Sequence, residues 1–311
     1  MRRLTPGWAL IVILLVLPAT GCLFRTRPVE ERYSKVPLKE ASQEQLIDGL
    51  RQQAQKIQSL QATLDIDTSA GGAKKGYRTE YKEIRGYILA RQPAMLHFIG
   101  LMPIVRTTAF DMVSDGRTFK LWIPPKNRFV EGSNDVHTYN PDKPMENMRP
   151  QDIYDALLIH PVEPPEIAVL ENGTEILHDA KGHRVLQDDY ELIVIRPKDG
   201  NEGTLTRKVV FSRVDLLPHR QYIYDEKGNL IADARYAEYK EYDGVNYPSR
   251  IEIFYPQEEY DITLNILKLE INKPLKDEQF TLEQPPGAEV VHLEKPQSSA
   301  VHGPTGDGAG K

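Results

Sequence analysis

Hydrophobic residues recur at two different spacings along this chain, and the spacing changes near residue 60. Before that point they recur every three or four positions, as on a helix that packs one side against a flat surface. Ser42 and Gln45 precede this stripe in the order of a capping box, in which each side chain bonds a backbone N–H of the first turn. We therefore predict a helix over residues 43–60. The apolar stripe consists of Leu46, Leu50, Ala54, Ile57 and Leu60.

Beyond residue 60 apolar and polar residues alternate, which is typical of strands with one buried face. Turn sequences such as Asp115-Gly116, Asn172-Gly173-Thr174 and Asp243-Gly244 separate these stretches, and short hairpins join antiparallel neighbours. The pattern predicts an antiparallel, meandering sheet. In the last stretch the apolar side changes after Ile266, which a bulge would absorb. The alternating stretches are 64–68, 84–91, 110–112, 119–123, 184–186, 190–195, 208–213, 221–224, 232–239, 250–255 and 261–271.

A second helix is predicted over residues 149–160, between two groups of strands. Ile153, Ala156, Leu157 and His160 share one of its sides, and Pro161 ends it. No linker rich in Gly and Ser separates the strands on its two sides, so residues 42–283 are predicted to form one domain.

The two ends of the chain lack these patterns. Residues 22–41 are polar and aperiodic, which predicts a flexible tether, and residues 284–311 have the Pro, Gly, Ser and Ala content of a disordered tail. Residues 1–21 have a positive start, a short apolar run and small residues before Cys22, as a secretory signal peptide does. The run is shorter than the roughly 20 apolar residues of a transmembrane helix.

Cys22 is the only cysteine in the chain, so it forms no internal disulfide. The segment Ala19-Thr20-Gly21-Cys22 resembles the bacterial lipobox, although Ala19 stands where leucine is usual. The resemblance implies that Cys22 is the lipidation site, and several acyl chains hold a protein stably on a membrane. Leu23, in place of Asp, favours sorting to the outer membrane by proteobacterial rules. The alternative is a stray cysteine beside an ordinary cleavage site.

Composition and motifs argue against several function classes. The net charge of −6 argues against binding nucleic acid through its phosphates. The chain has no Gly-x-Ser-x-Gly motif, and the segment 71–76 lacks the end of a phosphate loop and fits a hairpin tip. His178 and His183 with Asp188 and Asp189 could be imagined as metal ligands, but a turn between strands needs the same residue types. We therefore expect no catalytic residues, no metal and no cofactor.

The segment after Gly100 is unusually apolar for a hairpin connection. Composition leaves two interpretations, of which burial beneath helices is favoured, and the other is an exposed patch for lipid or protein. The segment consists of Leu101, Met102, Pro103, Ile104 and Val105.

Residues 94–124, "AMLHFIGLMPIVRTTAFDMVSDGRTFKLWIP", resemble the LolA/LolB-like lipoprotein carriers and receptors of the bacterial outer membrane. A strand, an apolar loop with glycine, a second strand, an Asp-Gly turn and an aromatic strand follow in the same order. Residues 211–253 and the closing "LEINKPLKDEQFTL" are similar to the family too. The likeness covers roughly residues 43–282.

The resemblance implies an α+β fold, an incomplete antiparallel β-barrel closed by helices around an apolar hollow for acyl chains. LolB-like receptors carry an apolar loop that contacts the membrane, so the resemblance favours exposure of residues 101–105 and assigns them to membrane or cargo. Together with the alternation it suggests the following wall residues of a lipid-binding cavity: Leu96, Phe98, Phe110, Met112, Leu121, Ile123, Ile251 and Ile253.

Two functions follow from this reading. In the first, the protein is a membrane-anchored lipoprotein that binds acyl chains of lipoproteins or other amphiphiles, in lipoprotein sorting or outer-membrane maintenance. Its partners are then the membrane, acyl chains and a periplasmic carrier protein, and it faces the periplasm from the outer membrane. In the second, the protein's own side chains fill the hollow, and an envelope sensor or scaffold binds other proteins through its outer surface.

Overall fold

The computed structural model describes residues 32–74, 76–134, 148–178 and 181–293. The predicted signal peptide and Cys22 lie outside these residues, as does the end of the predicted tail. The described residues form two compact units. The smaller unit contains those up to Val36 together with Thr174–Gln187, and the larger contains Pro37–Gly173 and the residues from Asp188 onward. The single domain predicted for residues 42–283 remains a prediction, and the larger unit holds most of it.

The larger unit is built from two antiparallel meanders of strands. β14 of the second meander pairs with β2 of the first and so joins the two into one sheet. The first consists of β2 (Ser59–Gly72), β3 (Tyr77–Arg91), β4 (Met95–Leu101), β5 (Thr108–Ser114), β6 (Thr118–Ile123) and β7 (Arg128–Ser133). The second consists of β9 (Arg184–Pro197), β10 (Gly203–Ser212), β11 (Pro218–Tyr224), β12 (Leu230–Tyr242), β13 (Val245–Tyr255) and β14 (Tyr260–Ile271).

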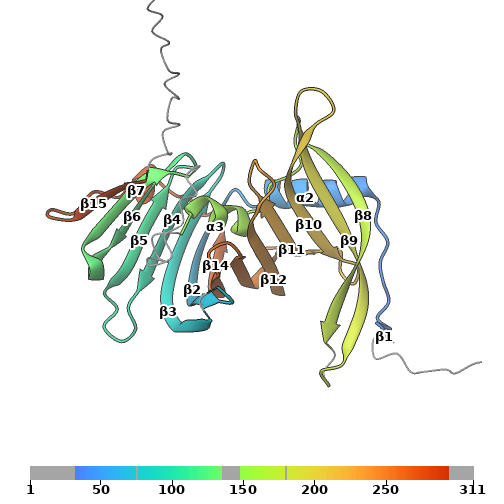
Figure 1. Ribbon diagram of the computed structural model, residues 1–311, viewed down its shortest axis with the longest axis horizontal. Helices are drawn as coiled ribbons and strands as arrows, with labels where there is room; N and C mark the ends of the chain where they lie inside the picture. The colour runs from blue at the N-terminus through green and yellow to red at the C-terminus, as the bar shows by residue number, and fades with distance from the viewer. Residues whose placement is uncertain (1–31, 75, 135–147, 179–180, 294–311) are drawn as a thin grey trace, which may run out of the picture. The chain divides into compact units, whose positions relative to one another are not determined.

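The sheet of the larger unit is open, because its strand order runs from β9 to β15 without returning to β9. The described residues are mostly β, and the antiparallel meander agrees with the alternation in the sequence (Figure 1). An open sheet is therefore confirmed. The α+β class and the closure of the barrel by helices remain predictions.

Helix α2 (Gln43–Lys56) packs on β9 and β10. Its capping box forms as predicted: the Gln45 amide N–H donates to Ser42 Oγ at 3.3 Å, and the Ser42 amide N–H donates to Gln45 Oε1 at 2.8 Å. The helix ends at Lys56 and not at residue 60. Leu60 belongs to β2, where its helical spacing from Ile57 coincides with the alternation of the strand.

Helix α3 (Pro150–Leu157) is also shorter than predicted, and His160 lies beyond its end. It is followed by β8 (Ile167–His178), which pairs with β9. The turn predicted at Asn172-Gly173-Thr174 is wrong, because these residues lie inside β8. Gly173 is needed there for close approach, since an added Cβ would stand 2.2 Å from Asp189 Oδ1.

The described parts of the chain ends pair with strands of the sheet. In the smaller unit β1 (Arg32–Tyr33) pairs in parallel with the start of β9, and in the larger unit the Lys39 amide donates to the carbonyl of Arg213 at 2.6 Å. The flexible tether predicted for residues 22–41 remains a prediction. β15 (Glu289–Leu293), within the predicted tail, pairs in parallel with β7. The disorder predicted for residues 284–311 remains a prediction. Both segments are held by backbone hydrogen bonds, which leave no periodic pattern in the sequence. Two 3-10 turns complete the described elements, η2 (Pro124–Lys126) and η4 (Asp277–Phe280).

Candidate functional site

The eight predicted wall residues come together in the main hydrophobic core of the larger unit. They lie on β4, β5, β6 and β13, and none is more than 4% exposed. Strand alternation points all of them to the same side of the sheet, which explains why the sequence alone could group them.

The hairpin of β4 and β5 is closely packed within this surface. The rings of Phe98 and Phe110 meet edge to face, with centroids 5.0 Å apart and planes at 82°. Gly100 leaves the space for the Phe110 ring, because an added Cβ would stand 2.3 Å from its Cε1 atom. The glycine that the sequence placed before the apolar loop therefore serves packing in the wall.

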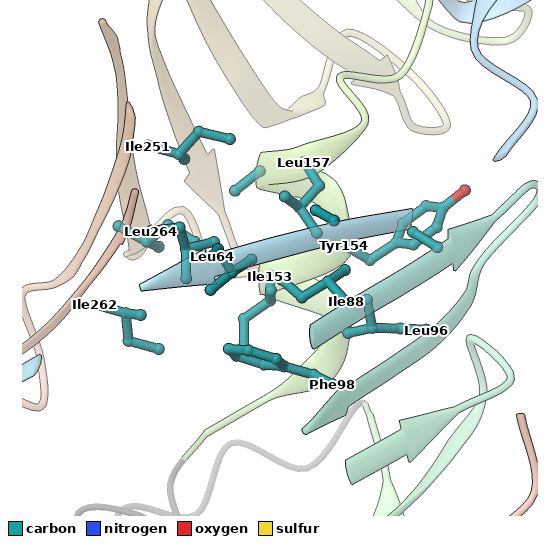
Figure 2. Packing of buried hydrophobic residues seen from close by; sticks show 14 of the residues in the cluster. Leu64, Ile88, Leu96, Phe98, Ile153, Tyr154, Leu157, Ile251, Ile262 and Leu264 are labelled. Atoms are coloured by element: carbon teal, nitrogen blue, oxygen red, sulfur yellow. The ribbon is translucent and has the colours of Figure 1, made fainter. Parts of the chain in front are cut away.

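Helix α3 covers this surface with its own apolar side chains. In Figure 2, Ile153 and Leu157 of α3 lie among Leu64, Leu264 and Ile251 of the strands. The described residues thus fill the predicted hollow from within. Tyr154 takes part in the same core, although it lies outside the helical stripe of Ile153, Ala156, Leu157 and His160 that the sequence predicts.

The loop between β4 and β5 is exposed, as the resemblance implied. Ile104 is 98% and Val105 67% exposed, whereas Leu101, the last residue of β4, is half-buried. Met102 and Pro103 are exposed as well, so the alternative of burial beneath helices is wrong for residues 102–105. Contact of this loop with membrane or cargo remains a prediction.

Backbone hydrogen bonds hold the loop in one shape. The Met102 amide donates to the carbonyl of Thr107 at 2.7 Å, and the Arg106 amide donates to that of Met102 at 3.0 Å. Ile104 has a φ of 67°, in the left-handed region that β-branched residues avoid. Such a conformation costs on the order of 1–3 kcal/mol. The chain therefore presents an isoleucine to solvent in a conformation that glycine or asparagine would adopt more easily.

A cleft of about 210 Å³ lies between α2, the β3–β4 turn and the residues that follow α3. Ile57, Tyr154, Leu157 and Leu158 belong both to its lining and to the main core. The cleft therefore leads from the surface to the edge of the predicted cavity. Its remaining lining consists of Gln53, Ala54, Gln92, Pro93, Ile159, His160, Pro161 and Glu163.

His160 is bound to the end of α3 through Asp155. His160 Nε2 lies 2.9 Å from Asp155 Oδ1, and the same oxygen accepts a hydrogen bond from Gln151 Nε2 at 2.6 Å. Burial lowers the pKa of His160, but the hydrogen bond and the negative charge of Asp155 outweigh it, so the pKa is raised overall. The imidazole thus favours its protonated form more than a free histidine does.

A buried ion pair fixes the segment that follows. Arg207 donates from Nη1 to Glu166 Oε1 at 3.0 Å and from Nη2 to Glu166 Oε2 at 2.8 Å, and each side chain is 10% exposed. Arg207 Nη2 also donates to the carbonyl of Pro161 at 2.9 Å. This planar two-point contact holds the strap of residues 158–166 against β10 and keeps the cleft in shape.

The first turn of α3 carries a buried carboxyl group. Burial raises the pKa of Asp152 to about 8, and the charge of Asp155 adds to the effect, while Arg149 opposes it. The Arg149 guanidinium lies over the ring of Phe119 at 5.5 Å. Asp152 is therefore largely protonated at neutral pH.

Among the described residues, no three His, Cys, Asp or Glu side chains gather closely enough to hold a metal ion. The described helices include none with the length and hydropathy needed to cross a membrane.

One sequence family matches part of this chain. A family model described only as an uncharacterized protein matches residues 175–284. No curated protein matches the chain.

Solved structures are similar over most of the chain. A DUF1329 family protein from Desulfovibrio piger superimposes with a TM-score of 0.50 at 15% identity, over 76% of this chain and 94% of that one. A putative outer membrane lipoprotein-sorting protein domain from Vibrio parahaemolyticus gives 0.47 at 17% identity, over 76% and 94%. A LolA superfamily protein from Nitrosomonas europaea gives 0.46 at 15%, over 76% and 97%. These likenesses concern the fold alone, and the chain shares the fold of the DUF1329 family protein over most of its length.

Proposed function

We propose that this protein is a membrane-anchored, non-enzymatic lipoprotein of the bacterial cell envelope that binds acyl chains beneath α3. The observation that carries the proposal is the continuity between the apolar wall and the exposed loop. β4 and β5 contribute Phe98 and Phe110 to the wall, and the same hairpin ends in Ile104 and Val105, which are open to solvent. One hairpin thus joins a surface that can meet lipid to a surface that can bury it.

Acyl binding requires α3 to move away from the wall residues, because its side chains pack against them. The energetics allow this exchange. Each methylene group that leaves water contributes about 0.8 kcal/mol, so one long chain can replace the contacts that a single eight-residue helix makes. Asp152, buried and largely protonated in the first turn of α3, lowers the cost of exposing that turn to water.

The proposal includes attachment of the protein to the membrane. A lipidated Cys22 would hold the chain on the outer membrane, facing the periplasm, and would keep the loop of residues 101–105 close to lipid. From there the protein would accept acyl chains of lipoproteins, or of other amphiphiles, from the membrane or from a periplasmic carrier protein. Lipoprotein sorting and outer-membrane maintenance are the roles that this arrangement fits.

A second candidate function rests on the packing of the wall itself. All eight wall residues are buried against α3 and neighbouring strands, as they would be in a protein that never opens. Such a protein would serve as an envelope sensor or scaffold and would bind other proteins through its outer surface.

Native mass spectrometry of the purified full chain tests the proposal against this alternative. Acyl binding predicts non-covalent lipid adducts that survive removal of detergent and add to the mass of any covalent anchor. A chain without such adducts, even after incubation with phospholipid vesicles, would favour the scaffold.

A further inference from the structure

The hydroxyl group of Tyr154 is buried without a hydrogen-bond partner among the described residues. The side chain is 1% exposed, lies in the main core and lines the cleft between α2 and the end of α3. In Figure 2 its oxygen points away from Phe98 and Ile153. Unsatisfied buried hydroxyl groups are uncommon in folded proteins and call for an explanation.

The electrostatics of Tyr154 make it a hydrogen-bond donor. Burial raises the pKa of its hydroxyl, and the nearby charge of Asp155 raises it further, so the proton stays on the oxygen at physiological pH. His160 lies beside it, with ring centroids 5.9 Å apart, but the charge of that imidazole is already paired with Asp155. Tyr154, which lines the cleft, thus carries a neutral O–H group.

The charges around the cleft select among oxygen-bearing ligands. The described residues that line the cleft include neither lysine nor arginine, and Glu163 adds a carboxylate at the exposed rim. An anionic phosphate or carboxylate would meet repulsion there and no free cation. A neutral carbonyl oxygen attached to an apolar chain fits both the donor and the apolar lining.

We infer that the cleft is the mouth of the acyl-binding cavity and that Tyr154 donates a hydrogen bond to the carbonyl oxygen of the acyl group, in an ester or an amide. The chain beyond that carbonyl passes Ile57 and Leu157 into the core, since both residues line the cleft and the core at once. This inference rests on the proposed function and adds the part of the lipid that is recognised. Both lipoproteins and glycerolipids carry such carbonyl groups.

Ester- and ether-linked phospholipids of equal chain length differ only in these carbonyl groups, so they form a matched pair of probes. The full chain is offered an equal mixture of the two, and native mass spectrometry gives the ratio of bound species. Because one hydrogen bond changes an equilibrium by a modest factor, wild type should bind the ester lipid about three- to tenfold better. Tyr154→Phe should bring the ratio to about one while still binding lipid.

Tyr236→Phe is the control, because the Tyr236 hydroxyl is also buried without a partner among the described residues but lies outside the cleft lining. It should keep the wild-type ratio. Equal binding of the two lipids by wild type, or an unchanged ratio in Tyr154→Phe, overturns the inference and leaves the proposed function standing. A wild-type chain that binds neither lipid contradicts both. A synthetic acylated lipopeptide and its alkyl-ether analogue, offered in the same way, tell lipoprotein acyl groups from glycerolipid ones.

Discussion

Gly100 of β4 lies directly against the ring of Phe110 on β5, with room for a hydrogen atom and not for a methyl group. The ring cannot move aside, because it is 4% exposed and meets Phe98 edge to face. Gly100, which lies in β4 just before the exposed loop, thus takes part in the packing of the wall.

Gly100→Ala should lower the free energy of unfolding by about 1–3 kcal/mol, as overpacking of a rigid core does. Chemical denaturation measures the loss. Gly49→Ala is the matched control, since Gly49 is on the exposed side of α2 with nothing within 4 Å of an added Cβ. That change should stabilise the protein by up to about 1 kcal/mol, because alanine favours a helix more than glycine does. Similar effects at both positions would contradict this account of Gly100.

Glu166→Ala should be costly because it leaves the buried Arg207 guanidinium without its carboxylate. Breaking a buried pair in this way typically costs about 3–5 kcal/mol. Asp48→Ala breaks the exposed pair of Asp48 with Arg51 on α2, and should cost under about 0.5 kcal/mol. Thermal melting of the two variants gives the comparison. If Glu166→Ala melts like Asp48→Ala, the ion pair does not hold the strap of residues 158–166.

Asp152→Asn should stabilise the protein increasingly between pH 4 and pH 8. The pKa of this carboxyl is about 8 in the folded protein, and its ordinary value, which applies to the unfolded chain, is 3.8. Between these two pH values the folded state retains a proton that the unfolded state loses. Wild-type stability from this group is therefore present at low pH and lost as pH rises through that range. Asparagine does not titrate, so the difference in melting temperature between variant and wild type should grow with pH. A difference that is constant from pH 4 to pH 8 would show that Asp152 ionises freely.

Replacing Ile104 and Val105 by Glu should weaken the binding of phospholipid vesicles by a chain that starts at Leu23 and so lacks Cys22. Both side chains are exposed, so the free energy of unfolding should change by about 0.5 kcal/mol or less. Co-sedimentation with vesicles measures the binding. Leu267→Glu, at another exposed apolar residue, should leave binding as it was. Equal effects of the two changes would mean that the loop has no special role in lipid contact.

Much of the sheet could be predicted from the sequence because alternation reports burial directly. The shift of the apolar side after Ile266 is an example: the pairing of β14 with β2 changes register between Ile266 and Lys268, so that Leu269 and Ile271 are buried as Ile262 and Leu264 are. The capping box of Ser42 and Gln45 could also be predicted, because both of its hydrogen bonds join residues that are close in sequence.

The interactions that the sequence did not reveal depend on distant partners. Nothing near Glu166 predicts a partner at Arg207, and nothing near Phe129 predicts that Val290 of β15 pairs with it. The cleft and the unpartnered hydroxyl of Tyr154 arise only when α2, the β3–β4 turn and the residues after α3 meet. The polar residues of the short helix α3 have no periodicity that could have indicated the cleft or the buried hydroxyl.

Entry of an acyl chain beneath α3 is the central claim, and the methionine methyl groups can test it by nuclear magnetic resonance with a spin-labelled fatty acyl ester. Met112 is fully buried in the wall, and Met102 is 37% exposed in the loop, so the two report on the cavity and on the surface. We predict that the bound ester, with its spin label near the end of the acyl chain, broadens the Met112 signal. Broadening of the Met102 signal, with Met112 unchanged at saturating ligand, would contradict it.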